Sequence, residues 1–122
     1  MRDYSKIEAW RLADDLTVAI YERTRNFPRE EVYGLTSQVR RASYSVPSNI
    51  AEGSSRESKR DYLHFLYIAR GSLSETQYFI HLSRRLGYLS PEEADSRWPR
   101  RLRSVVLLSC GLVVLLASLL AL

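Results

Sequence analysis

The sequence predicts an all-α protein, an antiparallel up-down four-helix bundle whose fourth helix is atypical. Apolar residues recur at steps of three and four in three long segments, which is the spacing of one buried helical face. No segment alternates apolar and polar residues in the way that a half-buried strand does. The chain has only five Gly and four Pro, too few for a loop-rich β-sandwich, and its 122 residues correspond to one domain.

The first helix is predicted from Ser5 to Phe27. Ser5 and Glu8 have the spacing of a capping box, in which each side chain bonds an unpaired amide of the first turn. Pro28 ends the helix, because it lacks a backbone N–H and disfavours the helical conformation of the residue before it. The buried stripe comprises Ile7, Trp10, Ala13, Leu16, Ile20, Thr24 and Phe27.

A second helix is predicted to begin between Glu30 and Gly34 and to end at Gly53, a natural C-cap. Pro47 lies inside this segment, so we expect a kink or a local break near residues 44–46. The apolar stripe comprises Leu35, Val39, Ala42, Val46 and Ile50.

The third helix is the longest, and we expect it over residues 57–86. Gly71 lies in its middle, where we interpret it as a point of close approach to a neighbouring helix. Gly87 ends the helix, and the two residues that follow are expected to pack back onto it. The buried face comprises Tyr62, Phe65, Leu66, Ala69, Leu73, Thr76, Ile80 and Ser83.

The chain after Gly87 changes character. Ser90, Pro91 and Glu93 are typical of a helix start, but Pro99 interrupts the helix within about two turns. Residues 104–122 then contain no charged side chain. The chain therefore divides into a three-helix core over residues 1–90 and, over residues 91–122, a fourth helix or an apolar, membrane-prone tail.

Three interpretations of this charge-free run remain open. Its 19 residues would span about 28 Å as a helix, close to the hydrocarbon thickness of a bilayer. The arginines before it would keep that end in the cytoplasm. A bundle helix buried on all sides in an oligomer has the same composition, and so does a tail altered by a change of reading frame.

The sequence shows no catalytic motif. A di-iron bundle needs a Glu three residues before each ligand His, and neither His64 nor His81 has one. Nucleophile motifs and Gly-rich phosphate loops are absent from the sequence as well. We therefore predict no catalytic residue, no metal site and no cofactor.

Basic residues give the stronger indication of function. The formal net charge is +4, and 16 of the 18 basic residues are Arg, whose guanidinium binds phosphate in a bidentate manner. Tyrosines that could stack on bases are interleaved with them, at positions 44, 62, 67 and 78. The alternative is a solvated helical face with these tyrosines in the core. The candidate nucleic-acid contacts are Arg40, Arg41, Arg56, Lys59, Arg60, Arg70, Arg84 and Arg85.

Three ordered strings, over residues 33–42, 45–53 and 65–75, together with Phe27-Pro28 and Glu31 before them, resemble the bacterial 23S rRNA intervening sequence proteins. The resemblance covers about residues 5–90. It implies a small antiparallel four-helix bundle that assembles into a homopentamer and has no established enzymatic activity. The motif residues are Gly34, Gln38, Pro47, Asn49, Glu52, Gly53, Gly71 and Glu75.

The accessory variability proteins of diversity-generating retroelements look like relatives of this family. They are basic pentamers that bind nucleic acid and a reverse transcriptase, which adds to the expectation of a nucleic-acid partner. The C-terminal segment departs from the family pattern, because members usually end in an amphipathic fourth helix.

The motif also predicts a polar network. The carbonyl groups freed by Pro47 need hydrogen-bond donors. We expect Arg40 or Arg41 to pair with Glu52 nearby, and Glu52→Ala to lower stability by more than a surface change would.

The sequence as a whole predicts a non-enzymatic, cytoplasmic, oligomeric adaptor with a basic face that contacts RNA or DNA. The alternative is a tail-anchored membrane protein that presents a helical bundle to a protein partner.

Overall fold

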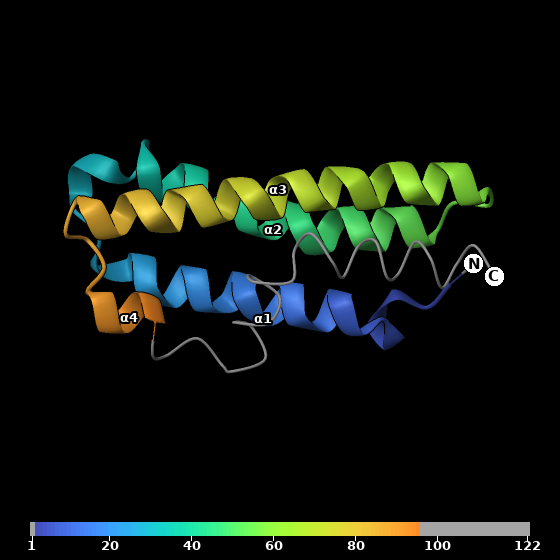
Figure 1. Ribbon diagram of the computed structural model, residues 1–122, viewed down its shortest axis with the longest axis horizontal. Helices are drawn as coiled ribbons and strands as arrows, with labels where there is room; N and C mark the ends of the chain where they lie inside the picture. The colour runs from blue at the N-terminus through green and yellow to red at the C-terminus, as the bar shows by residue number, and fades with distance from the viewer. Residues whose placement is uncertain (1, 96–122) are drawn as a thin grey trace.

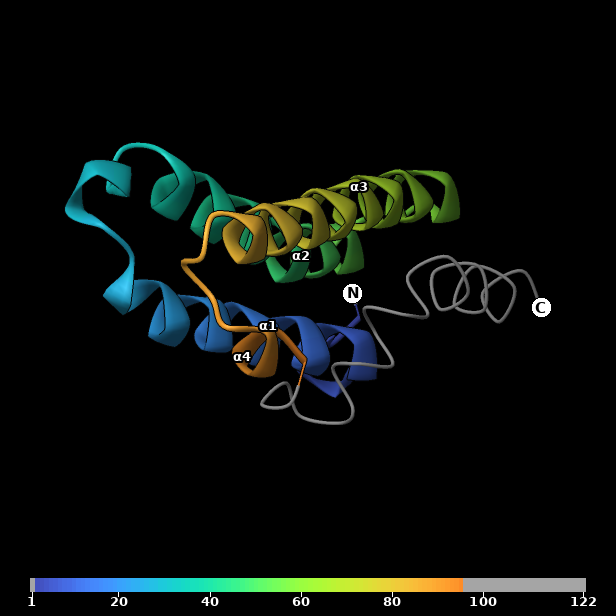
Figure 2. The ribbon, with the colours of Figure 1, turned by 60° about the vertical axis from the view of Figure 1, so that its left-hand side comes forward.

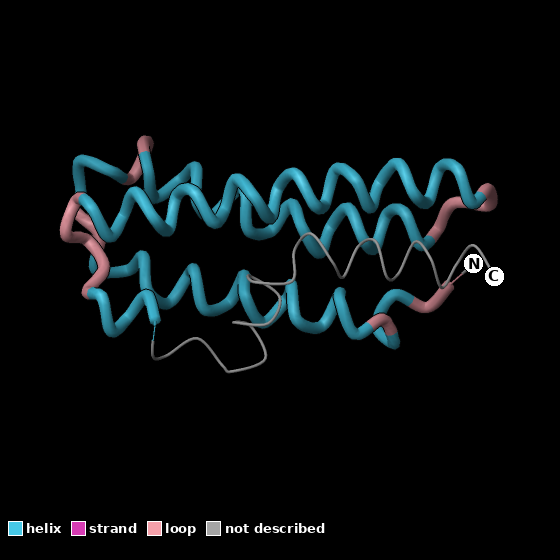
Figure 3. The backbone as a smooth tube through the Cα atoms, in the orientation of Figure 1, coloured by secondary structure: helices cyan, strands magenta, loops and turns pink. Residues whose placement is uncertain are grey.

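The structure, a computed structural model, describes residues 2–95 and is helical with no strand in that range (Figure 1). The helices pack against one another, which confirms the predicted all-α bundle. Short 3-10 turns flank them, and the connecting loops are short (Figure 3). The helices are α1 (Glu8–Arg23), α2 (Leu35–Ser54), α3 (Lys59–Arg85) and α4 (Pro91–Asp95), and the 3-10 turns are Tyr4–Lys6, Thr24–Asn26 and Arg29–Glu31.

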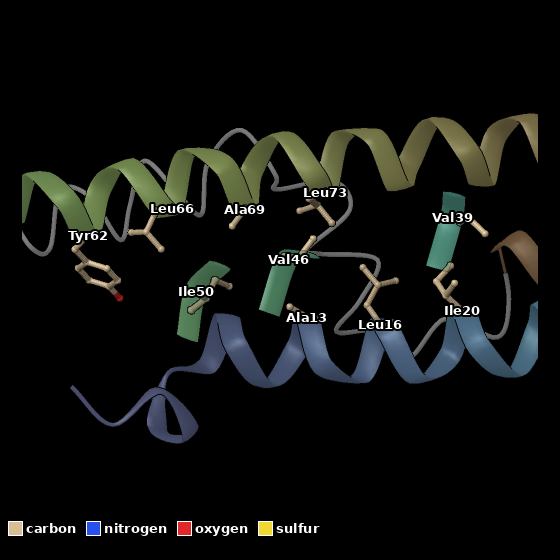
Figure 4. Packing of buried hydrophobic residues seen from close by; sticks show 10 residues of the cluster. All are labelled: Ala13, Leu16, Ile20, Val39, Val46, Ile50, Tyr62, Leu66, Ala69 and Leu73. Atoms are coloured by element: carbon tan, nitrogen blue, oxygen red, sulfur yellow. The ribbon is translucent and has the colours of Figure 1, made fainter. Parts of the chain in front are cut away.

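The core is formed by the apolar stripes of α1, α2 and α3 (Figure 4). All five predicted stripe residues of α2 are buried. On α1 and α3 most of the residues predicted to be buried are buried. Four of them are only half-buried, namely Ile7, Trp10, Phe65 and Ile80. The main cluster consists of Ala13, Leu16, Ile20, Val39, Val46, Ile50, Tyr62, Leu66, Ala69 and Leu73.

The predicted capping box at the start of α1 is wrong. Ser5 lies in a 3-10 turn, and its hydroxyl donates to the Asp3 carboxylate at 2.6 Å. Ile7 then has an extended backbone, and α1 begins only at Glu8. The helix also ends at Arg23, earlier than predicted, because the chain tightens into a 3-10 turn before Pro28.

The end of α3 follows the prediction. Gly87 has a φ of +76°, a left-handed conformation that glycine adopts without steric cost. The Tyr88 N–H donates to the Ser83 carbonyl at 2.9 Å and the Gly87 N–H to the Arg84 carbonyl at 3.0 Å, which together form a Schellman motif. Leu89 then packs back into a small buried cluster with Phe27 and Leu35.

The start of α4 is also as predicted. The Glu93 N–H donates to Ser90 Oγ at 3.0 Å, and the Ser90 N–H donates to the Glu93 carboxylate at 3.0 Å, so the capping box is formed. An Arg23 Nη1 bond to the Glu93 carbonyl ties α4 to α1. Pro99 and the charge-free run over residues 104–122 lie outside the described residues. Within residues 2–95, no helix is long and apolar enough to span a bilayer.

Pro47 does not break α2, so the predicted local break at residues 44–46 is wrong. The helix runs unbroken from Leu35 to Ser54 with Pro47 buried inside it. Pro47 has no N–H to give to the carbonyl of Ser43, four residues earlier. Thr17 Oγ1 of α1, which also lies 2.9 Å from the Ala13 carbonyl, approaches the Ser43 carbonyl at 3.0 Å. A neighbouring helix thus supplies the donor that the proline lacks.

The interpretation of Gly71 as a close-approach point is wrong, and Gly53 has that role. Gly71 is exposed, and a Cβ added there would meet nothing within 4 Å. At Gly53 an added Cβ would lie 2.7 Å from the Phe65 Cβ and 3.0 Å from the Tyr62 ring. Gly53 is not a C-cap either, because α2 continues to Ser54.

We expect the two glycines to respond in opposite ways to alanine. Gly53→Ala should destabilise the fold by about 1–3 kcal/mol, because the methyl group overpacks the α2–α3 contact. Gly71→Ala should stabilise it by roughly 0.5–1 kcal/mol, because alanine costs less helical entropy and the site has open space. Chemical denaturation of both variants checks this, and a destabilised Gly71→Ala would contradict it.

Candidate nucleic-acid interface

The eight basic residues predicted to contact nucleic acid do not gather at one site. Arg40 and Arg41 lie in the first half of α2, at the end of the bundle where α1 and α3 terminate (Figure 1). Arg84 and Arg85 end α3 on the same side, and we call this the basic end. By the rise of an α-helix, Arg60 lies about 36 Å from Arg84 along α3.

The remaining four candidates lie at the opposite end of the bundle or in the middle of α3, and they have local partners or are exposed. Arg56 forms an ion pair with Glu52 at 2.7 Å, and its guanidinium lies 4.7 Å from the centroid of the Phe65 ring. Lys59 and Arg60 are exposed in the first turn of α3. Arg70, in the middle of α3, lies over the Tyr67 ring at 5.0 Å.

The expected network of Arg40 or Arg41 with Glu52 is wrong. Glu52 is eleven residues beyond Arg41, about 16 Å along the same helix, and out of reach. Arg41 instead pairs with Glu75 of α3 at 2.5 Å, and its Nε donates to Gln38 Oε1 at 3.2 Å. The Glu52 pair is exposed and spaced i,i+4, so its loss should cost only about 0.3–0.5 kcal/mol, no more than a surface change.

Asn49, another motif residue, takes part in a polar contact between α2 and α3. Its Nδ2 donates to the carbonyl of Ser45 at 2.7 Å and lies 3.0 Å from the Ser45 hydroxyl. Ser72 of α3 donates to the same hydroxyl at 3.0 Å. This contact is structural and lies apart from the basic end.

A cavity of about 490 Å³ opens between α1 and α2 at the basic end. Figure 2 shows the segment between the two helices bridging them at this end. We call it the α1–α2 cavity. Four of the side chains that line the cavity are arginines, and no Asp or Glu occurs among its described lining residues. The lining residues are Tyr21, Thr24, Arg25, Phe27, Arg29, Val32, Thr36, Ser37, Arg40, Arg41 and Tyr44.

Arg40 is held in a fixed position in this cavity. Its Nε donates to Thr24 Oγ1 at 2.8 Å, and the Thr24 hydroxyl donates in turn to the Ile20 carbonyl at 2.8 Å. The guanidinium carbon lies 4.6 Å from the centroid of the Tyr21 ring. A cation over an aromatic face is stabilised electrostatically, so the wall presents an oriented positive group.

Gly34 shapes the start of α2 beside the cavity. A Cβ at Gly34 would lie 2.6 Å from Oε2 of Glu31, which accepts the Leu35 N–H at 2.8 Å and so caps the helix. The other carboxylate oxygen of Glu31 accepts from the Tyr88 hydroxyl at 3.1 Å. Burial, followed by this bond to Glu31, raises the pKa of Tyr88 above its ordinary value.

Thr36 is the second residue of α2 and lines the cavity. It is 6% exposed, and its buried hydroxyl has no hydrogen-bond partner among the described residues. Leaving a buried polar group unpaired costs about 1–3 kcal/mol. An unpaired hydroxyl of this kind in a cavity wall is consistent with contact to a ligand.

The other residues considered from the sequence are placed as follows. Tyr62 is 3% exposed and belongs to the core, so it is not available for stacking. Tyr44, Tyr67 and Tyr78 are exposed. His64 and His81 are exposed on α3, and residues 2–95 contain no cluster of three or more His, Cys, Asp or Glu side chains arranged to hold a metal ion.

Sequence reasoning missed Arg25 and Arg29. Both flank Phe27-Pro28 in the connection between the first two helices, outside any helical stripe. In an antiparallel hairpin, this connection must lie beside the start of the second helix, where Arg40 and Arg41 are. The closeness of this connection to the start of the second helix was the signal that could have found Arg25 and Arg29.

The described chain is therefore a small helical-bundle protein with arginines gathered around a cavity at one end. It belongs to the 23S rRNA-intervening sequence protein family, whose model matches residues 5–100. Among curated proteins, none matches the chain significantly. The fold is similar to the crystal structure of a protein with unknown function from the S23 ribosomal protein family of Bacteroides thetaiotaomicron. The two chains are 20% identical, with a TM-score of 0.72, over 89% of this chain and 97% of that one.

We expect Thr36→Val to raise stability by about 1 kcal/mol, because it removes a buried hydroxyl that has no partner among the described residues. Thr76→Val is the matched control, since the buried Thr76 hydroxyl donates to the Ser72 carbonyl at 2.8 Å. That variant should be destabilised. Thermal and chemical unfolding measure both, and equal responses of the two variants would contradict the assignment.

Proposed function

We propose that the protein is a non-enzymatic, cytoplasmic adaptor that self-associates and contacts nucleic acid through its basic end. The observation that carries the proposal is the α1–α2 cavity, where four arginines meet with no carboxylate among the described lining residues. Arg84 and Arg85 are exposed at the same end of the bundle. Guanidinium groups bind phosphate oxygens with paired hydrogen bonds, so this surface suits a polyanion.

The second basic cluster, Arg56, Lys59 and Arg60, lies at the opposite end of the bundle. Arg56 is partly neutralised by Glu52, whereas Lys59 and Arg60 have no ionic or hydrogen-bonding partner for their side chains among the described residues. A long nucleic-acid strand bound at the basic end, or a second nucleic-acid molecule, could also contact this second cluster. We assign this second cluster the smaller share of binding, because it contains fewer arginines and one of them is paired with a carboxylate.

Binding to single-stranded RNA should weaken steeply with salt. Four phosphate contacts, each contributing about 0.7, predict a slope of roughly −3 for log affinity against log salt concentration. The double variant Arg25→Gln/Arg29→Gln should reduce the magnitude of this slope by about 1.4. Fluorescence anisotropy over a salt series, with single-stranded RNA and duplex DNA as probes, measures it.

Lys59→Gln/Arg60→Gln is the control, because it removes the same charge from exposed side chains at the other end. We expect a smaller reduction in slope from this pair. Binding that does not depend on salt, or an equal reduction from both pairs, would contradict the basic end as the main contact surface.

Self-association is part of the proposal and follows from the pentamer that the family resemblance implies. It is supported by large apolar side chains on the outer surface of α3, where Tyr67 and Tyr78 are 56% and 57% exposed. Ile68 is 40% exposed beside them. Larger contiguous apolar patches on a protein surface commonly mark interfaces.

Light scattering of the full chain should give a mass five times the 14.1 kDa of one chain. Tyr67→Glu/Tyr78→Glu should lower that mass, because it places charge in an apolar contact. Tyr33→Glu, at a position that is 96% exposed in the connection before α2, should not. A parent protein that is monomeric at all concentrations would contradict self-association.

A further inference from the structure

We propose that the α1–α2 cavity binds the terminal phosphomonoester of a nucleotide, carried either by a strand end or by a free mononucleotide. For strand ends the inference deepens the proposed function and rests on it. The volume of about 490 Å³ lies within the range of about 300–1,000 Å³ typical of small-molecule sites. The cavity is walled by α1, by the connecting segment and by α2, so a chain end fits it better than the middle of a strand.

The charge of the cavity favours a dianion. Arg25 and Arg29 have no hydrogen-bonding or ionic partner for their side chains among the described residues, and Arg40 has a neutral one. Arg41 alone is compensated, by Glu75. A terminal phosphomonoester carries a charge of about −1.5 to −2 at neutral pH, against one for an internal phosphodiester. It also presents three acceptor oxygens to guanidinium donors.

The start of α2 adds donors that do not depend on arginine. Thr36 and Ser37 line the cavity and lie in the first turn of a long helix, whose amide N–H groups have no acceptor within the helix. Glu31 already caps the Leu35 N–H, so the unused amides are the two that follow it. Helix N-termini favour anions through these amides and through the helix dipole.

Thr36 is the independent sign of a ligand. Its hydroxyl is buried at the cavity wall and has no partner among the described residues, although it is a good donor to phosphate. The fold thus retains a polar group that packing alone does not require.

The aromatic residues suit a nucleotide better than a simple phosphate. Tyr44 lines the cavity and is 47% exposed, so its ring is open to stacking. One face of the Tyr21 ring is covered by Arg40, and Phe27 is buried. Stacking on one tyrosine is tolerant of base identity, so we infer little preference among bases.

The test compares one short single-stranded RNA with a phosphate at its 5′ end, at its 3′ end, or at neither. AMP is compared with adenosine, and inorganic phosphate serves as the minimal probe. Isothermal titration calorimetry with the full chain should give at least one phosphorylated RNA about tenfold tighter binding than the hydroxyl form. AMP should likewise bind more tightly than adenosine and inorganic phosphate.

Variants locate the site. Arg25→Gln/Arg29→Gln should abolish the preference for the terminal phosphate, whereas Lys59→Gln/Arg60→Gln should weaken overall RNA binding and keep the preference. Thr36→Val should reduce the preference while remaining at least as stable as the parent, which separates lost binding from lost folding. A preference that survives in Arg25→Gln/Arg29→Gln overturns the inference.

The failures of the two proposals are distinguishable. If all three RNAs bind equally and AMP binds no better than adenosine, the inference is overturned and the proposed function stands. If no RNA binds but AMP binds through Arg25 and Arg29, the cavity takes a free nucleotide and the proposed function fails. If nothing binds, both are overturned.

Discussion

The structure depends on the burial of α2 against two partners at once. Half of its twenty residues are buried, over a sector wide enough to face both α1 and α3. Small residues make this double contact feasible, because Ser43 admits α1 and Gly53 admits α3 at short range. The same packing directs Arg40 toward Thr24 and Tyr21 and brings Arg41 to Glu75 of α3.

Pro47 shows how tightly α2 is coupled to its neighbours. A proline inside an isolated helix leaves a carbonyl without its donor and destabilises the helix. Here the unpaired carbonyl of Ser43 faces α1, and Thr17 supplies a hydroxyl to it. The polar pair is confined to the interface between two helices, so it stabilises the packed arrangement more than either helix alone.

The sequence was sufficient to predict the helices and the core, because apolar periodicity and helix-end signals are local. The stripe of α2, the Gly87 motif and the Ser90 capping box all depend on residues within a few positions of one another. The local failure is at the ends of α1, where Ser5 bonds Asp3 in a 3-10 turn and the helix ends at Arg23. The other failures concern contacts between helices. Gly53 and Gly71 both lie inside helices, and the positions of Tyr62 and Phe65 beside Gly53 distinguish them.

The candidate site was predictable to a similar degree. Arg40 and Arg41 stood out as a basic pair in a predicted helix. Their partners did not, because Arg41 pairs with a carboxylate 34 residues away and Arg40 with Thr24 in the 3-10 turn that follows α1. Arg25 lay off the apolar stripe of the helix predicted to Phe27, and Arg29 lay in the connection after it. Both come close to Arg40 and Arg41 only when the antiparallel hairpin forms.

Folding and ligand binding make opposite demands on the α1–α2 cavity. The positive charges of Arg25, Arg29 and Arg40 around one cavity repel each other, because among the described residues only Arg41 has a carboxylate partner there. An unpaired hydroxyl at Thr36 lowers stability further. A chain optimised for packing alone would fill this space with apolar side chains and leave the arginines spread over the surface. The buried clusters of α1, α2 and α3 are apolar and stabilise the fold, so the fold tolerates the unfavourable α1–α2 cavity. An anion bound in the cavity would reverse both costs, because it neutralises the guanidinium groups and gives the hydroxyl an acceptor.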